Sequence, residues 1–266
     1  MPVFAGQGDP AWSLAALWGA AEPPPARPGP RPSLSLDAIV AAAIEIADRG
    51  GLAALSMKAV GQRLGCTAMA LYTYVPGKAE LLDLCYDRVY AELPTSYPTG
   101  RGWRAAARAW ARDLGEFYLR HPWTLQISYA RPVLGPNEQA VVETLTGILR
   151  HTGLGPAAVR RAVSALLHLV RGAAQTRIDA RAAPTATGTP SAAWWQARAP
   201  QLQKVAPDFA SRFPHTVWLG QGAAAGDRGD PEDYLVRQAD DAYAAGVELL
   251  LDGIEAQRAA QGTGRP

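Results

Sequence analysis

The stretch that decides the fold is LSMKAVGQRLGCTAMALYTYVPGKAELL, residues 55–82 of a 266-residue chain. It predicts a short helix that Ser56 caps and Gly65 ends, because a hydroxyl suits a helix start and glycine suits its end. Thr67 then caps another helix, which Pro76 stops. Two short helices joined by a glycine-containing turn are typical of a helix-turn-helix. We expect three apolar side chains to belong to its core: Val60, Leu64 and Leu71.

Helical patterns continue on both sides of this stretch. Between Ser35 and the pair Gly50-Gly51, apolar residues recur every three to four positions, which is the period of a helix with one buried face. Another apolar stripe begins near Lys78 and ends at Pro94. We therefore expect a helix-turn-helix domain over residues 33–93.

The charge of this stretch supports contact with nucleic acid. The whole chain has a net charge of only +2, so the case depends on local charge. From Ser56 to Lys78 there are three basic residues and no acidic one. The second helix presents short or aromatic uncharged side chains, which suit base edges, thymine methyls and phosphates. The expected DNA-binding residues are Lys58, Thr67, Ala68, Met69, Tyr72, Thr73, Tyr74 and Lys78.

These residues resemble the DNA-binding motif of TetR-type repressors. The resemblance is carried by the Leu-Gly-Cys-Thr turn, the Ala-Leu-Tyr-x-Tyr-Val helix and the following Lys-x-Glu-Leu-Leu, and it covers about Ser35–Asp87. Tyr74 stands where the family often has histidine. More loosely, residues 121–123 (His-Pro-Trp) and 134–137 (Leu-Gly-Pro-Asn) resemble the ligand-binding half of a tetracycline-repressor-like subgroup.

The resemblance implies a homodimer in which each recognition helix enters the major groove of a palindromic, double-stranded operator. By resemblance, Thr67, Ala68 and Met69 contact base edges, and Lys58 contacts a base edge or a phosphate. The residues that contact the DNA backbone are Tyr72, Tyr74 and Lys78. Arg27 and Arg31, which precede the motif, are expected to add minor-groove or phosphate contacts.

Longer helical patterns follow a Pro- and Gly-rich hinge at residues 94–102, and no alternating strand pattern occurs. The fold class is therefore all-α. We expect polar loops at residues 182–190 and 220–229. By resemblance, the helix that begins at Pro156 and the last helix pair with their copies in the dimer. The expected parts are a flexible arm (1–32), the helix-turn-helix domain (33–93), a helical ligand-binding and dimerisation domain (100–258) and a disordered tail (259–266).

The first 32 residues are rich in proline, glycine and alanine, which predicts an extended linker rather than a packed element. One alternative is a short helix that Trp12 and Trp18 anchor. Another alternative is that translation begins at a later start codon. No Lys or Arg precedes the apolar stretch Trp12–Ala21, so it lacks the features of a secretory signal. With no long apolar run and only two cysteines, we expect a cytoplasmic protein.

Eight tryptophans are a high number for this length. Cavities lined by aromatic side chains are a usual form of small-molecule site, so we expect an apolar or aromatic effector. For each aromatic residue alone, the alternative is a place in the core. His168, on the expected buried face of its helix, is either a core histidine or a ligand contact. The expected ligand-binding residues are Trp103, Trp110, Phe117, Trp123, Tyr129, His168, Trp194 and Trp195.

The sequence thus predicts a transcriptional repressor that a small-molecule inducer releases from DNA. The four histidines share no metal-ligand spacing with cysteines or acidic residues, so we expect no metal or cofactor. We find no nucleophile elbow, phosphate-cradling glycine loop or paired acid and base, which argues against an enzyme. The remaining alternative is a helical protein-interaction module with a vestigial helix-turn-helix.

Overall fold

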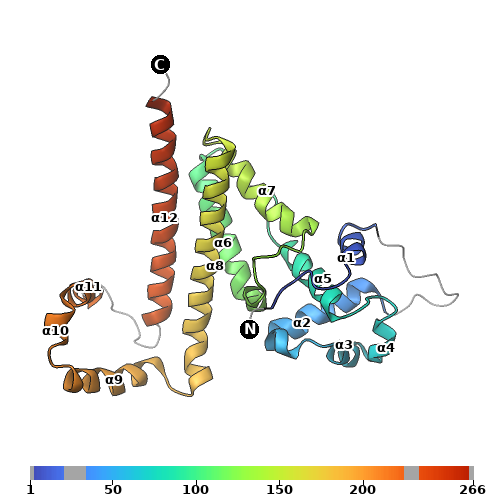
Figure 1. The fold of residues 1–266 in the computed structure, drawn as a ribbon, viewed down its shortest axis with the longest axis horizontal. Helices are drawn as coiled ribbons and strands as arrows, with labels where there is room; N and C mark the ends of the chain where they lie inside the picture. Colours follow the sequence, from blue (N-terminus) through green and yellow to red (C-terminus); the bar gives the residue numbers. More distant parts are fainter. Residues whose placement is uncertain (1–2, 21–33, 225–233, 264–266) are drawn as a thin grey trace. The chain divides into compact units, whose positions relative to one another are not determined.

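The computed structural model describes residues 3–20, 34–224 and 234–263, and it confirms an all-α fold (Figure 1). Within these residues the only extended pairing is an isolated bridge between Val3 and Ile127. The helices are α1 (Pro10–Leu17), α2 (Leu36–Ala54), α3 (Met57–Leu64), α4 (Ala68–Leu71), α5 (Lys78–Tyr90), α6 (Trp103–Arg120), the 3-10 helix η1 (Pro122–Gln126), α7 (Pro136–Arg150), α8 (Pro156–Thr187), α9 (Ser191–Val205), α10 (Phe209–Arg212), α11 (Pro214–Ala224) and α12 (Tyr234–Thr263).

The described residues form two compact units. One unit contains residues 3–20 and 34–171 and the part of α12 that begins at Val247. It therefore holds the helix-turn-helix domain together with α6, η1, α7 and the first half of α8. The other unit lies within residues 172–246 and contains α9, α10 and α11.

Helices α2, α3, α4 and α5 pack on one another around a small apolar core. Val60, Leu71 and Val75 have no exposed surface, whereas Leu64 is half-buried. The core prediction is therefore confirmed for Val60 and Leu71. At Gly51 the backbone has a φ of 67°, and helical turns resume beyond it as far as Ala54. The expected end of this helix is thus a kink, which glycine accommodates without steric cost.

The N-terminal segment differs from the extended linker that its composition predicted. Residues 10–17 form α1, which packs on α5. Asp9 caps this helix by accepting hydrogen bonds from the amides of Ala11 and Trp12, and Pro10 occupies the first turn, where its missing N–H costs nothing. Burial of Ala5 and Ser13 supplies the packing that a free arm lacks. Arg27 and Arg31 lie outside the described residues.

The loops expected in the C-terminal half are also partly helical. Helix α8 continues to Thr187, through most of the expected loop at residues 182–190, although Pro184 lies inside it. The alanines around this proline favour a helix, which explains the error. Helix α11 includes residues 220–224, and the rest of that expected loop lies outside the described residues. No helix in the described ranges is long and apolar enough to cross a membrane.

Candidate nucleic-acid interface

The turn between α3 and α4 is fixed by local hydrogen bonds and by two glycines. Ser56 Oγ accepts a hydrogen bond from the amide of Ala59 at 3.1 Å, which caps α3. Gly65 ends α3 in the left-handed conformation, with a φ of 69°. A Cβ atom at Gly61 would lie 2.8 Å from the carbonyl oxygen of Cys66, so only glycine permits this close approach. Thr67 Oγ1 then caps α4 through the amide of Ala70 at 3.3 Å.

The side chains expected to bind DNA lie on the outside of this motif. Met69 is 76% exposed and Tyr72 is 49% exposed, although both are large and apolar in part. A buried core at Leu71 holds the helix that presents them. The other exposed members of the expected set are Lys58, Thr67, Thr73 and Lys78, whereas Ala68 and Tyr74 are half-buried.

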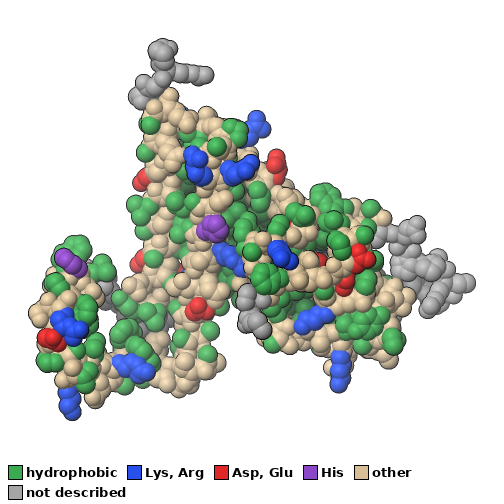
Figure 2. Space-filling model, in the orientation of Figure 1, with side chains coloured by type: hydrophobic (Ala, Val, Ile, Leu, Met, Phe, Trp, Pro, Cys, Tyr) green, Lys and Arg blue, Asp and Glu red, His purple; other side chains and the backbone are tan. Residues whose placement is uncertain are grey.

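The basic side chains of the motif differ in their surroundings. Arg63 donates to Glu45 Oε2 at 2.8 Å, so its charge is engaged by a carboxylate of α2. No ion pair of Lys58 or Lys78 is found within the described residues. In the view of Figure 2, the basic side chains over α2, α3 and α4 lie apart from one another. Local positions, not a broad basic field, therefore favour an anionic partner here.

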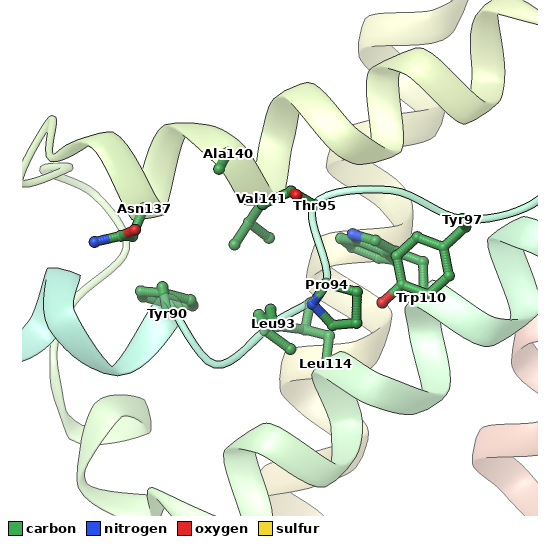
Figure 3. A pocket seen from close by; sticks show the side chains of 10 residues that line it. All are labelled: Tyr90, Leu93, Pro94, Thr95, Tyr97, Trp110, Leu114, Asn137, Ala140 and Val141. Carbon is green, nitrogen blue, oxygen red and sulfur yellow. The ribbon is translucent and has the colours of Figure 1, made fainter.

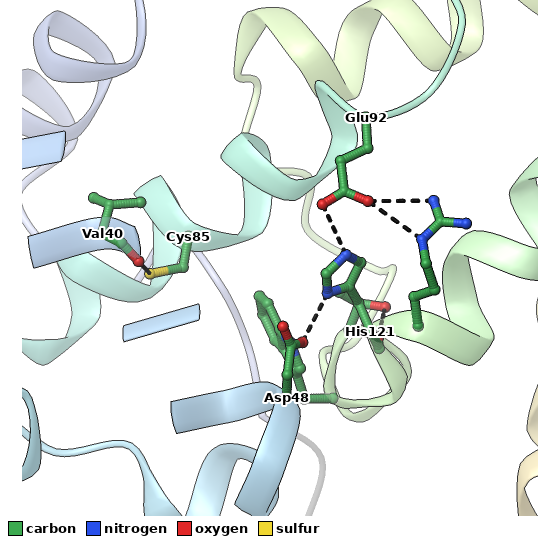
Figure 4. Close-up of polar contacts among 8 residues, drawn as sticks. Val40, Asp48, Cys85, Glu92 and His121 are labelled. Carbon is green, nitrogen blue, oxygen red and sulfur yellow. Dashed lines mark hydrogen bonds and ion pairs between the residues drawn. The ribbon is translucent and has the colours of Figure 1, made fainter. Parts of the chain in front are cut away.

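A histidine connects the helix-turn-helix domain with α6 (Figure 4). His121 directly follows α6, and its Nδ1 lies 2.7 Å from Asp48 Oδ1 on α2. Its Nε2 lies 3.1 Å from Oε1 of Glu92, which follows α5. Trp123 Nε1 donates to the same Asp48 oxygen at 2.7 Å. The His121 ring therefore lies between two carboxylates, one on α2 and one just after α5.

A second connection joins α5 to the start of α7. Asp87 Oδ1 accepts from the amides of Asn137 and Glu138 at 3.0 and 2.8 Å, and Oδ2 accepts from Asn137 Nδ2 at 2.8 Å. A Cβ atom at Gly135 would lie 2.2 Å from Asp87 Oδ1, so glycine is required beside the carboxylate. Burial raises the pKa of Asp87, and these hydrogen bonds oppose the rise.

Sequence reasoning missed both connections. They join residues about 30 to 75 positions apart, so no local pattern reveals the pairing. The only signal was the likeness of residues 121–123 and 134–137 to a known family, and it did not identify the partners Asp48 and Asp87.

The expected ligand-binding residues do not gather in one place. Trp103, Trp110 and Phe117 are buried on α6, and Trp123 is fully buried against Asp48. Trp194 and Trp195 belong to the other unit, where they line an apolar groove with Arg198, Leu202 and Phe209. His168 is exposed, so its expected place on a buried face is wrong; its ring lies 6.3 Å from that of Tyr129, which is also exposed.

Of these residues, Trp110 lines a small cavity in the first unit (Figure 3). Its volume is only about 10 Å³, far below the roughly 300–1,000 Å³ of typical ligand pockets. Apolar and polar side chains from α5, α6, α7 and the hinge surround it. The lining residues include Tyr90, Tyr97, Leu114, Asn137 and Val141.

Next to this cavity lies a buried polar cluster that the sequence did not predict. Tyr90 stacks on Phe117 with ring centroids 4.7 Å apart, and its hydroxyl donates to that of Tyr86 at 3.1 Å. The guanidinium of Arg171 lies over the ring of Tyr118. Burial raises the pKa of Tyr86, Tyr90 and Tyr118, so all three keep their hydroxyl protons and can donate hydrogen bonds. Within the described residues, no group of three histidine, cysteine or acidic side chains is arranged to hold a metal ion.

Two family models match the chain. Residues 39–85 match the model described as "Bacterial regulatory proteins, tetR family", and residues 97–258 match "Tetracyclin repressor-like, C-terminal domain". Among curated proteins, the HTH-type transcriptional repressor DrrR1 of Streptomyces coeruleorubidus is 38% identical over 252 residues, which are 94% of this chain and 87% of that protein. An HTH-type transcriptional regulator of Saccharopolyspora erythraea is 35% identical over 218 residues, or 82% of this chain and 89% of that protein.

Solved structures give the same result. ActR from Streptomyces coelicolor, a TetR family protein solved in complex with actinorhodin, is 27% identical, with a TM-score of 0.63 over 86% of this chain and 98% of that one. Apo ActR is 28% identical, with a TM-score of 0.63 over 85% and 98%. The matched models, the relatives and the geometry of α3 and α4 agree. The chain belongs to the TetR family and is a DNA-binding transcriptional regulator.

Proposed function

We propose that the chain is a repressor that binds a palindromic operator as a homodimer and leaves it when a small molecule binds. The observation that carries this proposal is the outer surface of α4. This single helical turn exposes Met69, and its caps Thr67 and Tyr72 are also exposed, while Leu71 is fully buried. A rigidly held helix with short or adaptable exposed side chains suits entry into a major groove.

The DNA contacts divide by chemistry. Thr67, Ala68 and Met69, at the start of α4, are the base readers in this proposal, and Lys58 on α3 adds a base or phosphate contact. Tyr72, Thr73 and Tyr74 contact the sugar-phosphate backbone. Lys78, in the first turn of α5, neutralises a phosphate.

The dimer in this proposal forms through α8 and α12. Exposed apolar side chains favour such an interface, because their contact with water is unfavourable in free energy and a second copy would remove it. Leu249 on α12 is 71% exposed, and it is large enough to anchor contacts with a second copy. The relatives are transcriptional regulators, which favours this function over an enzyme or an interaction module.

The effector in this proposal is an aromatic molecule. ActR has been solved with actinorhodin, which supports a small-molecule effector for this chain. Trp110 and Tyr90 line the small cavity, so an effector that widens it would meet an apolar ring and a hydroxyl that can bond to an oxygen-bearing ring system. Release follows if the effector binds more tightly to a state whose recognition helices are wrongly spaced for the operator.

A gel-shift titration with the duplex DNA upstream of the gene tests the proposal. We expect sequence-specific retardation at moderate salt, and Lys78→Ala should flatten the log–log salt dependence by about one unit. Tyr72→Ala should also weaken binding while the dimer, measured by sedimentation, stays intact. Arg63→Ala is the matched control, because Glu45 already engages that charge. No specific retardation by the full chain would overturn the proposal.

A further inference from the structure

Residues 3–18, which we name the N-terminal strap, touch both the helix-turn-helix domain and the helical body behind it (Figure 1). At its start the strap pairs with the chain that follows η1. The amide of Val3 donates to the carbonyl of Gln126 at 3.3 Å, and the amide of Ser128 donates to the carbonyl of Val3 at 2.7 Å. This end is therefore attached to the body, a few residues after His121.

The middle of the strap binds α5 through two buried carboxylates. Asp83 Oδ1 accepts from the amide of Gly6 at 2.7 Å, and its Oδ2 accepts from Ser13 Oγ at 3.2 Å. Glu80 Oε1 accepts from the amide of Asp9 at 2.9 Å. Buried carboxylates need such donors, because an unpaired charge in the interior is costly. Burial raises the pKa of Asp83, and the donors from Gly6 and Ser13 oppose that rise.

The far end of the strap returns to the body. Trp18 Nε1 donates to the carbonyl of Leu134 at 3.0 Å, just before α7. The strap therefore spans from η1, across α5, to the start of α7. It also lies outside the segments at 39–85 and 97–258 that match the two family models.

We infer that the N-terminal strap positions the helix-turn-helix domain against the body, with Asp83 as the positioning residue that receives it. The covalent link between the two parts is the hinge between α5 and α6. The Asp48–His121 and Asp87–Asn137 contacts also join the two parts, and any rotation that they still allow changes where α4 points. A strap that is fixed to the body at both ends and to α5 between them restricts that rotation, so it preorganises the operator-binding orientation.

The strap can be displaced without altering the DNA-binding domain. A Cβ atom at Gly8 would lie 2.2 Å from Glu80 Oε1, so Gly8→Val must shift the Glu80 side chain or the strap and should weaken the contact between them. Leu14→Ala is the matched control, because Leu14 lies on α1 and is exposed. A chain that lacks residues 2–20 removes the strap entirely, and Ser13→Ala weakens it by a single hydrogen bond.

The first readout is the distance between spin labels at Gln62→Cys on α3 and Arg150→Cys on α7, both exposed positions. Cys66→Ser removes the accessible thiol, and an excess of unlabelled chain suppresses distances between copies. We expect a narrow distribution for the full chain and for Leu14→Ala, and a broader one for Gly8→Val and the truncated chain. An unchanged distribution in the truncated chain would overturn the inference.

The second readout is operator affinity, which rests on the proposed function. We expect about a tenfold loss for Gly8→Val, which corresponds to about 1.4 kcal/mol of coupling, with Ser13→Ala intermediate and Leu14→Ala unchanged. Full affinity in the truncated chain would contradict a positioning role even if the label distances broaden. If the full chain binds no operator, the proposed function fails, and the label distances still decide whether the strap holds the domain.

Discussion

The helix-turn-helix and the segment at residues 191–224 are both helical. The helix-turn-helix buries large apolar side chains, whereas the segment at 191–224 exposes them. Helices α3 and α4 have eight and four residues, below the roughly 12–15 that an isolated helix needs in water. They nevertheless bury Val60 and Leu71 completely. Helices α9 and α11 are longer, at 15 and 11 residues, yet Trp195 and Trp218 are exposed there.

The difference shows that burial, rather than helix length, stabilises elements in this chain. Each short helix of the motif has a capping hydroxyl and at least one fully buried apolar side chain. The segment at 191–224 has longer helices but little core of its own. The four predictions below test this contrast, from the largest expected effect on the free energy of unfolding to the smallest.

Leu71→Ala should lower the free energy of unfolding by about 2–5 kcal/mol, because it opens a cavity beneath the recognition helix. Leu71 has no exposed surface. Urea unfolding followed by circular dichroism measures the effect. Met69→Ala, two residues away and 76% exposed, is the control and should change it by less than about 0.5 kcal/mol. If Leu71→Ala and Met69→Ala lower the free energy of unfolding equally, burial does not explain the stability of this helix.

Glu138→Gln should make stability less dependent on pH. Burial, aided by the neighbouring charge of Asp87 and opposed by the hydrogen bond from the amide of Leu134, raises the pKa of Glu138 from 4.5 to about 7. A carboxyl whose pKa is raised in the folded state stabilises the fold below its unfolded pKa, and this contribution is lost as pH rises from about 4.5 to 7.

The amide in Glu138→Gln stays neutral and can still accept from the amide of Leu134, which Glu138 does at 2.8 Å. We therefore expect the variant to be more stable than the parent at pH 8, by at most about 3 kcal/mol, and to differ little at pH 5. Urea unfolding at both pH values measures this. If the parent instead becomes more stable between pH 5 and 7, and the variant has no advantage at pH 8, the assignment is wrong.

His121→Ala should cost about 1–2 kcal/mol, because it leaves Asp48 and Glu92 without their shared donor. The effect is smaller than that of a core cavity, since Glu92 is almost half exposed and water partly replaces the histidine. Arg120→Ala is the control, because it removes only the exposed partner of Glu92. If both variants unfold at the same urea concentration as the parent, the connection contributes nothing to stability.

Trp218→Ala should change the free energy of unfolding by less than about 0.5 kcal/mol, because Trp218 is 71% exposed on α11. The same urea titration measures it. A loss above 1 kcal/mol would mean that other residues cover this surface in solution, and the contrast with the helix-turn-helix would then fail.

Much of the DNA-binding half could be predicted from sequence, because its signals are local. Ser56 and Thr67 cap helices three residues ahead of their hydrogen-bond donors, and Gly65 ends α3 where glycine is expected. Caps and helical periodicity depend on neighbours within one or two turns, so the chain alone reveals them. The same reasoning failed for His168, because a helix has several possible apolar faces and packing partners decide which one is buried.

The sequence by itself thus determined an all-α chain, a helix-turn-helix over α3 and α4, and most of the residues that this motif exposes. Only the tertiary structure decided how the motif is held. The Asp48–His121 contact joins residues 73 positions apart, and the Gly6–Asp83 hydrogen bond joins residues 77 apart. Neither pair leaves a trace in local spacing, because a hydrogen bond between distant residues depends on the path of the whole chain between them.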